Sequence, residues 1–335
     1  MGSCSIDCFS SVSGPNSVAA TGGSLRCAAH TLLKGDLFLT LLRVFLLAAL
    51  LVAPTARAAA QSQGSPPADP IELDVMTFNI RTSSGRDGNN SWPFRKELVA
   101  ETIGRSNPHL VGLQEVLGEQ IEFLEAALPE YRWLGVDRGL NGGTGLSEAT
   151  PIFYRYRELI PIESGTFWLG DPPRDRFRGS SRGRGGSRIV TWARFHHLES
   201  GQQIYAYSTH FTLREGPRQL DSATRINEHI SALPPGSTVI VMGDFNAAAE
   251  SSETWRVATS EGLRDAWSIA TERHGPAVTS NGFEPPPMDW EQRIDWILVG
   301  GPIDVPTIST IVHSVEGRYP SDHYPVLATI RVRPS

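Results

Sequence analysis

Residues Thr238–Asn246 read Thr-Val-Ile-Val-Met-Gly-Asp-Phe-Asn, an apolar run that ends in a carboxylate and an amide. The apolar run predicts a buried strand, and side chains two positions apart on a strand face the same way. We therefore expect Asp244 and Asn246 to point into one space. Later in the chain, Ser321–Val326 reads Ser-Asp-His-Tyr-Pro-Val, so an acid and an imidazole stand just ahead of the apolar run Val326–Val332. Carboxylates, an amide and an imidazole at strand ends favour a divalent-metal site that hydrolyses phosphate esters.

Apolar runs alternate with helical patterns from Ile71 onward. Helical spacing predicts helices at Trp92–Ser106, Gln120–Leu128 and Pro217–Leu233. Many strands with few helices between them favour a single layered α/β domain, in which two packed sheets carry helices on their outer faces. The predicted strands are Ile71–Arg81, Leu110–Val116, Tyr131–Val136, Pro151–Arg157, Ser164–Leu169, Ile189–Leu198, Gln202–Phe211, Thr238–Asp244, Arg293–Val299, Thr307–Val315 and Val326–Val332.

The first sixty residues differ from the rest of the chain. Leu37–Ala53 is apolar at all but two positions, Lys34 stands just upstream, and Ala-Arg-Ala-Ala-Ala follows, ending at Ala60. A basic flank, an apolar stretch and small residues at alternate positions predict a secretory signal peptide, cleaved after Ala58 or Ala60.

A retained membrane anchor is the alternative for this segment. Its uninterrupted apolar core, Val44–Ala53, is well short of the roughly 20 residues that a spanning helix needs. We therefore expect a secreted or periplasmic monomer with no stable membrane insertion after cleavage, and an N-terminally anchored protein otherwise. The predicted organisation is a leader over 1–60 with its apolar core at 37–53, a linker over 61–70 and a domain over 71–335.

Composition narrows the chemistry of the exported part. All three cysteines lie in the leader, so residues 61–335 carry no disulfide and no thiol nucleophile. The leader holds four of the 30 basic and two of the 36 acidic residues, which leaves 26 basic against 34 acidic residues, a balance of −8. Non-specific nucleic-acid binders usually carry the opposite sign. This balance argues against DNA as the substrate, although an acidic protein can still have a basic cleft.

Other polar residues also stand at the ends of predicted strands. Asn79 and Glu115 each follow an apolar run, and their amide and carboxylate oxygens suit magnesium. Asp295 lies inside an apolar strand, where a carboxylate costs several kcal/mol unless it is paired, and His323 is its natural partner. His210 also ends a strand, where a lone histidine is more often structural than catalytic.

The segment Asp171–Arg188 interrupts the pattern of strands. It holds six arginines among Gly, Ser and Pro. A solvated surface loop is one interpretation. The other is a cationic flap over an anionic substrate, because arginine pairs with phosphate bidentately. Under the second interpretation, the candidate substrate-binding residues are Arg182, Arg184 and Arg188.

Six motifs occur in one order along the chain: Phe-Asn-Ile, Gln-Glu-Val, Ser-Thr-His, Gly-Asp-Phe-Asn, Arg-Ile-Asp-Trp-Ile and Ser-Asp-His-Tyr-Pro-Val. Together they resemble the endonuclease/exonuclease/phosphatase superfamily, and in particular its small exported bacterial branch. The resemblance spans Ile71 to Val332. It implies a four-layer α/β/β/α sandwich of two mixed β-sheets flanked by helices, with the active site at one edge of the sandwich.

The resemblance also implies roles for individual residues. Metal ligands for Mg²⁺, with Mn²⁺ as the alternative ion, would come from Asn79, Glu115 and Asp322. The catalytic set would be Asp244 for the attacking water, Asn246 for a phosphate oxygen, and His210 and His323, the latter supported by Asp295, for the transition state. The chain departs from the branch in two places. Thr212 stands two positions after His210, where an acid often occurs in this branch. The arginine-rich segment Asp171–Arg188 also differs from the corresponding sequence of small members.

The resulting hypothesis is an exported, Mg²⁺-dependent phosphoesterase that hydrolyses a phosphate mono- or diester by in-line attack of water. Its substrate would be a small-molecule, lipid-linked or nucleic-acid phosphate ester. A secreted nuclease acting on DNA or RNA is the alternative within this class. A non-catalytic anion-binding module on the same fold is the alternative from another class.

Overall fold

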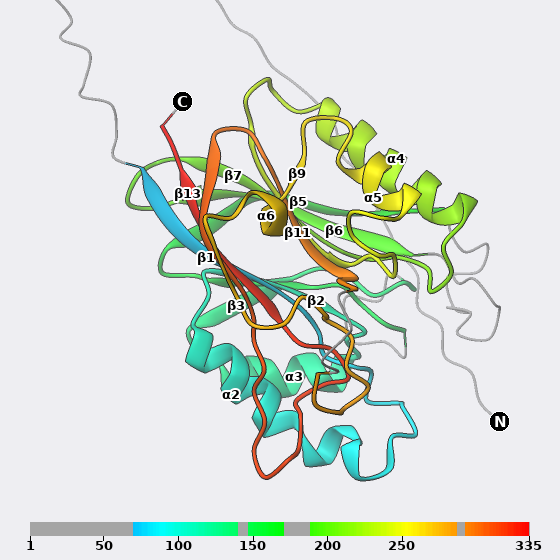
Figure 1. The fold of residues 1–335 in the computed structure, drawn as a ribbon. Helices are drawn as coiled ribbons and strands as arrows, with labels where there is room; N and C mark the ends of the chain where they lie inside the picture. Colours follow the sequence, from blue (N-terminus) through cyan, green and yellow to red (C-terminus); the bar gives the residue numbers. More distant parts are fainter. Residues whose placement is uncertain (1–69, 140–146, 171–187, 287–291, 335) are drawn as a thin grey trace, which may run out of the picture. The chain divides into compact units, whose positions relative to one another are not determined.

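A computed structural model describes residues 70–139, 147–170, 188–286 and 292–334 (Figure 1). The predicted leader, the linker before Pro70, Arg182 and Arg184 lie outside the described residues. The chain divides into two units, Met1–Gln63 and Gly64–Ser335, and the second contains every described residue. No helix within the described ranges is both long and apolar enough to cross a membrane.

Two mixed sheets form the centre of the described domain (Figure 1). The first sheet has the strand order β10-β12-β13-β1-β2-β4-β3, and its strands are β1 (Ile71–Asn79), β2 (Leu110–Gln114), β3 (Tyr131–Leu134), β4 (Ile152–Arg155), β10 (Glu272–His274), β12 (Ile303–Thr310) and β13 (Val326–Val332). The second sheet has the order β5-β6-β7-β8-β11-β9, and its strands are β5 (Leu159–Trp168), β6 (Ile189–His197), β7 (Gln203–His210), β8 (Thr238–Asp244), β9 (Arg264–Asp265) and β11 (Asp295–Gly300).

Helices cover the outer faces of both sheets. Figure 1 shows α2 (Lys96–Ser106) and α3 (Gly118–Ala127) on one side of the pair, and α4 (Pro217–Ser231) and α5 (Glu253–Ala258) on the other. The short elements are η1 (Gly88–Asn90), η2 (Trp92–Phe94) and α6 (Ala266–Ile269). The four-layer α/β/β/α sandwich expected from the resemblance is therefore confirmed.

Three apolar clusters separate the four layers, and β8 shows how one strand serves two of them. Ile240 and Met242 pack between the sheets, whereas Val239 and Val241 pack against the side that carries α4. Neighbouring side chains on a strand point to opposite faces, so a strand covered on both faces must be apolar throughout. The sheets approach closely at Gly112, where an added Cβ would lie 2.8 Å from the Cβ of Met242.

The structure corrects two predicted strands and adds short elements. β5 covers Leu159–Trp168, whereas the prediction was Ser164–Leu169. β12 covers Ile303–Thr310, whereas the prediction was Thr307–Val315. Its pairing with β13 shifts between Asp304 and Thr307, and this irregularity accommodates Pro306, which cannot donate a ladder hydrogen bond. The sequence pattern also missed α5, α6, β9 and β10, which are each too short to show a period.

Candidate active site

The ends of three neighbouring strands place acids and a histidine in one row. His210 at the end of β7 pairs in register with Asp244 at the end of β8, and Asp244 pairs with Asp295 at the start of β11. In the first sheet, Asn79 at the end of β1 pairs with Gln114 at the end of β2, and Glu115 follows directly. The facing sheets thus bring their polar strand ends to one edge of the sandwich.

Asp244 lies at the centre of this edge and is buried, with only 1% of its surface exposed. Its Oδ2 accepts a hydrogen bond from Asn79 Nδ2 at 2.9 Å, which bridges the two sheets. His210 Nε2 lies 3.5 Å and His323 Nε2 lies 4.0 Å from the same oxygen. Burial and the nearby Asp295 carboxylate raise the pKa of Asp244 to about 7, against the opposing effects of His323 and Asn79.

The predicted pairing of Asp295 with His323 is present: Asp295 Oδ2 lies 2.9 Å from His323 Nδ1. Burial by itself would lower the pKa of His323, but the Asp295 and Asp244 carboxylates raise it well above the ordinary value. His210 behaves oppositely, because burial and the guanidinium of Arg188 hold its pKa well below the ordinary value. The site therefore combines one charged and one neutral imidazole, a difference that suits separate proton-transfer roles.

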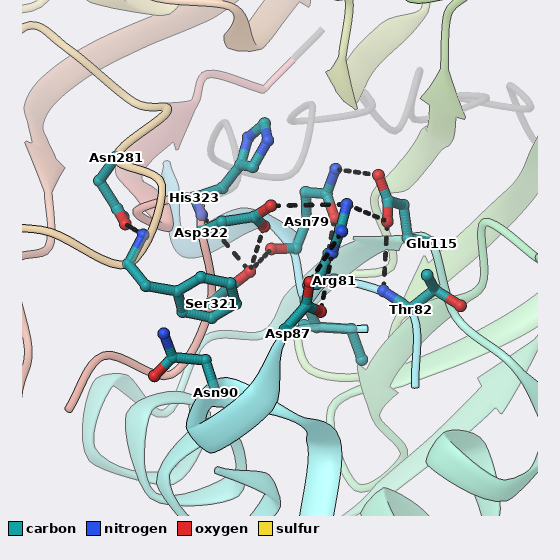
Figure 2. Close-up of polar contacts among 12 residues, drawn as sticks. Asn79, Arg81, Thr82, Asp87, Asn90, Glu115, Asn281, Ser321, Asp322 and His323 are labelled. Atoms are coloured by element: carbon teal, nitrogen blue, oxygen red, sulfur yellow. Dashed lines mark hydrogen bonds and ion pairs between the residues drawn. The ribbon is translucent and has the colours of Figure 1, made fainter. Parts of the chain in front are cut away.

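The predicted metal ligands Asn79, Glu115 and Asp322 lie near one another (Figure 2), and Asn79 contacts the row through its hydrogen bond to Asp244. Glu115 Oε1 accepts a hydrogen bond from Asn79 Nδ2 at 3.3 Å, and Glu115 Oε2 accepts one from the Thr82 N–H at 3.2 Å. Ser321 Oγ donates to the carbonyl of Asn79 at 2.7 Å, which places the adjacent Asp322 next to the end of β1. Burial raises the pKa of Asp322.

A guanidinium occupies the space between the two acidic ligands. Arg81 Nη1 lies 3.6 Å from Asp322 Oδ2 and 3.9 Å from Glu115 Oε2 (Figure 2). Asp87 holds the same guanidinium through hydrogen bonds of 3.1 and 3.0 Å. The Arg81 guanidinium thus lies where a positive charge is needed to offset two carboxylates. Two carboxylates with a neighbouring amide are the oxygen ligands that Mg²⁺ or Mn²⁺ prefers. The residues fit the metal that the family implies.

A second group could also hold a metal ion. Ligand atoms of Asp244, Asp295 and His323 all lie within 4.8 Å of one another. Two of these three residues already satisfy each other through the hydrogen bond between Asp295 and His323 Nδ1.

Three residues of the site have left-handed backbone conformations, which are uncommon for residues other than glycine. Arg81, Glu115 and Asn246 have φ of 55°, 61° and 49°. Backbone strain of this kind concentrates at functional sites. Each of the three residues lies just beyond the end of a strand, where the chain turns to place its side chains.

Asn246 was expected to face the same way as Asp244 because both would lie on one strand. This expectation is wrong, since β8 ends at Asp244. The N–H of Asn246 instead donates to Asp244 Oδ1 at 2.9 Å, which forms a tight turn. Its side-chain Nδ2 donates to the carbonyl of Phe211 at 3.1 Å. Asn246 thus ties the loop after β8 to the end of β7, and its role toward a phosphate oxygen stays a prediction.

Arg95, which no sequence motif marked, is a fully buried arginine that organises the site. Its guanidinium donates to the carbonyls of Ile80, Arg81 and Asn90 on one side and of Pro320 on the other. These bonds connect the loop after Asn79 to the segment before Asp322. Burial lowers the pKa of Arg95 to about 10. No periodicity in the sequence marks this position.

Two further arginines lie near the row. Arg138 Nη2 lies 2.7 Å from Glu148 Oε2. Arg188, which the sequence suggested as substrate-binding, directly precedes β6. Arg81 was missed as well, although its position two residues after Asn79 at a strand end was a usable signal. Arg138 was also missed, although it lies two residues after the predicted strand Tyr131–Val136.

The chain resembles known proteins in both sequence and fold. Residues 76–323 match the sequence model of the Endonuclease/Exonuclease/phosphatase family. A solved endonuclease/exonuclease/phosphatase from Bacteroides vulgatus is 31% identical, with a TM-score of 0.71, over 78% of this chain and 100% of that chain. A mannosyl-6-phosphatase from Bacteroides thetaiotaomicron is 27% identical, with a TM-score of 0.68, over 77% and 99% of the two chains.

A more distant structure shares the fold. TDP2 from D. rerio, solved with a single-stranded DNA product, is 18% identical, with a TM-score of 0.59, over 77% of this chain and 98% of that chain. No protein with curated function matches the chain significantly.

Proposed function

Because the chain belongs to the endonuclease/exonuclease/phosphatase family, we propose that it is a metal-dependent phosphoesterase whose water nucleophile is activated by Asp244. Members of this family are hydrolases that act on phosphate esters. The observation that carries the proposal is the position of Asp244, which contacts Asn79 of the opposite sheet and faces two histidines. A carboxylate with a pKa of about 7 can accept a proton from water near neutral pH.

The metal site completes this arrangement. We assign Glu115 and Asp322, with Asn79 beside them, to one Mg²⁺ ion, with Mn²⁺ as the alternative. When bound, the ion would offset negative charge on the phosphate oxygens. Arg81 lies against both carboxylates and limits their mutual repulsion before the ion arrives.

The histidines divide the remaining work. His323 carries a proton on Nδ1 toward Asp295 and directs Nε2 toward Asp244, so it can donate a proton or a hydrogen bond to the phosphate. His210 is neutral and places Nε2 near Asp244, where it can orient the attacking water. Asp295 acts through His323, whose orientation and charge it fixes.

We propose a small or lipid-linked phosphate ester as the substrate. The balance of −8 outside the leader supports this choice over nucleic acid. The mannosyl-6-phosphatase among the similar structures is a relative whose name specifies a sugar phosphate. The nuclease alternative would be favoured by binding to duplex DNA that weakens steeply with salt. A non-catalytic module is disfavoured because each predicted catalytic position carries a chemically competent residue.

Export of the protein is also a proposal, supported by the apolar segment Leu37–Ala53 and the small residues that follow. The test is N-terminal sequencing of protein recovered from the periplasm or medium of an expressing bacterium. The expected N-terminus is Ala59 or Gln61. Intact protein retained in the membrane fraction would instead support the anchored alternative.

The proposed activity is tested with the full chain in Mg²⁺, in Mn²⁺ and in EDTA. Candidate substrates are p-nitrophenyl phosphate, bis-p-nitrophenyl phosphate, sugar phosphates, inositol polyphosphates, sphingomyelin and plasmid DNA. We expect metal-dependent turnover of at least one substrate, and a loss of at least about a hundredfold in Asp244→Asn. The matched control is Asp304→Asn, which changes an exposed acid on β12. Equal turnover in Asp244→Asn and the control would refute the assignment of Asp244.

A further inference from the structure

One buried nitrogen of an arginine near the site lacks a hydrogen-bond partner among the described residues. The Nη1 atom of Arg188 is inaccessible to solvent and has no partner among the described residues. Burial lowers the pKa of Arg188 to about 10, which reflects how little solvation the guanidinium retains. Burying an unpaired guanidinium nitrogen lowers the stability of the folded protein unless an anion accepts its hydrogen bond.

Strand pairing places Arg188 at the active-site edge. Val190 on β6 pairs with Thr209 on β7, and Thr209 Oγ1 donates to the carbonyl of Ile189 at 3.3 Å. Arg188 therefore lies just beyond the end of β6, beside the end of β7 that carries His210. The electrostatics agree, because the carboxylates of Glu148, Asp244 and Glu115, in this order of effect, act to raise the pKa of Arg188.

Arg138 reaches the same region from the first sheet. Ala149 forms isolated bridges with both Val116 and Asp137, so the residue after Asp137 lies near the strand end that carries Glu115. Glu148 holds the Arg138 guanidinium at 2.7 Å. Arg138 also acts to lower the pKa of both Arg188 and His210, which shows that its charge reaches the row of catalytic side chains.

The strand orders separate this arginine pair from the metal ligands. Along the second sheet, β6 and β11 flank β7 and β8, so Arg188 and Asp295 lie on opposite sides of Asp244. In the first sheet, Arg138 follows β3 at one end of the order, whereas Asp322 precedes β13 on the other side of β1. A phosphorus atom above Asp244 would therefore have the metal site on one side and the arginine pair on the other.

We propose that Arg138 and Arg188 bind the terminal oxygens of a phosphomonoester dianion and make this protein a monoesterase. The inference rests on the proposed phosphoesterase function. A monoester offers three non-bridging oxygens and two negative charges, enough to engage both the metal side and two guanidinium groups. A diester has one charge and two such oxygens, and its second substituent would face the two cations. The like charges of Arg138 and Arg188 repel each other less when a dianion lies between them.

The test measures binding of two small probes by calorimetry, using the full chain in Mg²⁺ at pH 8. The probes are inorganic phosphate, a dianion at this pH, and dimethyl phosphate, a monoanion that mimics a diester. We expect the wild type to prefer phosphate and Arg188→Met to weaken phosphate binding by at least about tenfold, while dimethyl phosphate changes less than about threefold. Arg188→Lys keeps the charge without the planar fork and should give an intermediate affinity for phosphate.

The matched control is Arg194→Met, on the strand β6 that follows Arg188, where the side chain pairs with Glu163 at 3.4 Å. Neither probe should bind differently to it. If circular dichroism shows that Arg188→Met is unfolded, Arg138→Met replaces it, because the proposal places the Arg138 guanidinium on the same phosphate. It should also weaken phosphate binding selectively. Equal loss of both probes, or no loss, in the folded variant would overturn the proposal.

This design separates the inference from the proposed function. Probe binding needs no turnover, so selective loss in Arg188→Met would stand even if every tested substrate were left intact. In a hydrolytic enzyme, Arg188→Met should lower kcat/KM for monoesters at least about tenfold more than for diesters. If Arg188→Met hydrolysed monoesters and diesters in the same ratio as the wild type, the inference would be refuted and the phosphoesterase function would stand.

Discussion

The imidazole of His323 bridges two carboxylates, with Nδ1 lying 2.9 Å from Asp295 Oδ2 and Nε2 lying 4.0 Å from Asp244 Oδ2. The two acids are paired in register on β11 and β8, so the sheet itself fixes the spacing that the ring spans. A carboxylate on each side stabilises the charged ring. The arrangement holds Nε2 toward the centre of the site with a proton available.

Asp295→Asn should lower kcat at least about a hundredfold with little change in KM. The change removes the charge that holds His323 protonated and lets the amide favour the wrong ring tautomer. The measurement is steady-state kinetics on the best substrate from the activity screen. Asp304→Asn is the control for a carboxylate lost elsewhere. A variant with wild-type kcat would show that Asp295 only stabilises the fold.

Glu115→Gln should raise the Kd for Mg²⁺ at least about tenfold, because it removes one of two charged ligands. The readout is calorimetric titration of EDTA-treated protein without substrate, so it does not depend on turnover. Glu119→Gln, on the exposed face of α3, is the matched control. The metal assignment would not survive if Glu115→Gln bound Mg²⁺ as tightly as the control.

Arg95→Lys should destabilise the domain by about 2–4 kcal/mol. The planar guanidinium donates to four carbonyls at once, which the single ammonium group of lysine cannot do. The bonds at stake join the loop after β1 to the segment that carries Asp322. Urea unfolding followed by circular dichroism measures the loss. Arg105→Lys, on the exposed side of α2, should change the unfolding free energy by less than about 0.5 kcal/mol. A similar small change in Arg95→Lys would contradict the role given to Arg95.

The sequence predicted the strands that carry the site because each is a long apolar run with a clear end. The bounds of β8 and β13 are those predicted, since Gly243-Asp244 ends one run and Pro325 precedes the other. The error at β12 has a different cause. Pro306 reads as a break in a strand, and only the pairing with β13 shows that the strand continues through an irregularity.

The site could be predicted only in part, for a reason rooted in side-chain length. Asn79, Asp244 and His323 have short side chains, so their positions at strand ends largely determine where their polar atoms lie. Arginine side chains are long, and the sequence does not reveal whether the guanidinium reaches solvent or folds back into the protein. Arg81 and Arg95 both fold back onto the site. The strand end before Arg81 was a usable signal, whereas no pattern of apolar residues predicts the position of the Arg95 guanidinium.

A histidine remote from the site should make stability depend on pH. His109 Nδ1 accepts a hydrogen bond from the Asp74 N–H at 2.8 Å, so this nitrogen carries no proton in the folded protein. Its Nε2 lies 2.9 Å from Glu158, whose charge favours the protonated ring. Burial outweighs that attraction and lowers the pKa of His109 below 6.5. We conclude that the folded protein holds this ring neutral.

The unfolded chain therefore takes up a proton at His109 at a higher pH than the folded protein does. The contribution to stability is full above about pH 6.5 and is lost as the pH falls toward the lower folded-state pKa, at up to about 1.4 kcal/mol per pH unit. His109→Asn keeps an acceptor for the Asp74 N–H but cannot titrate. Urea unfolding between pH 5 and 8 should show a shallower decline below pH 6.5 in this variant than in the wild type. The exposed His274→Asn should keep the wild-type slope, and parallel curves for wild type and His109→Asn would mean that folding leaves the pKa of His109 unchanged.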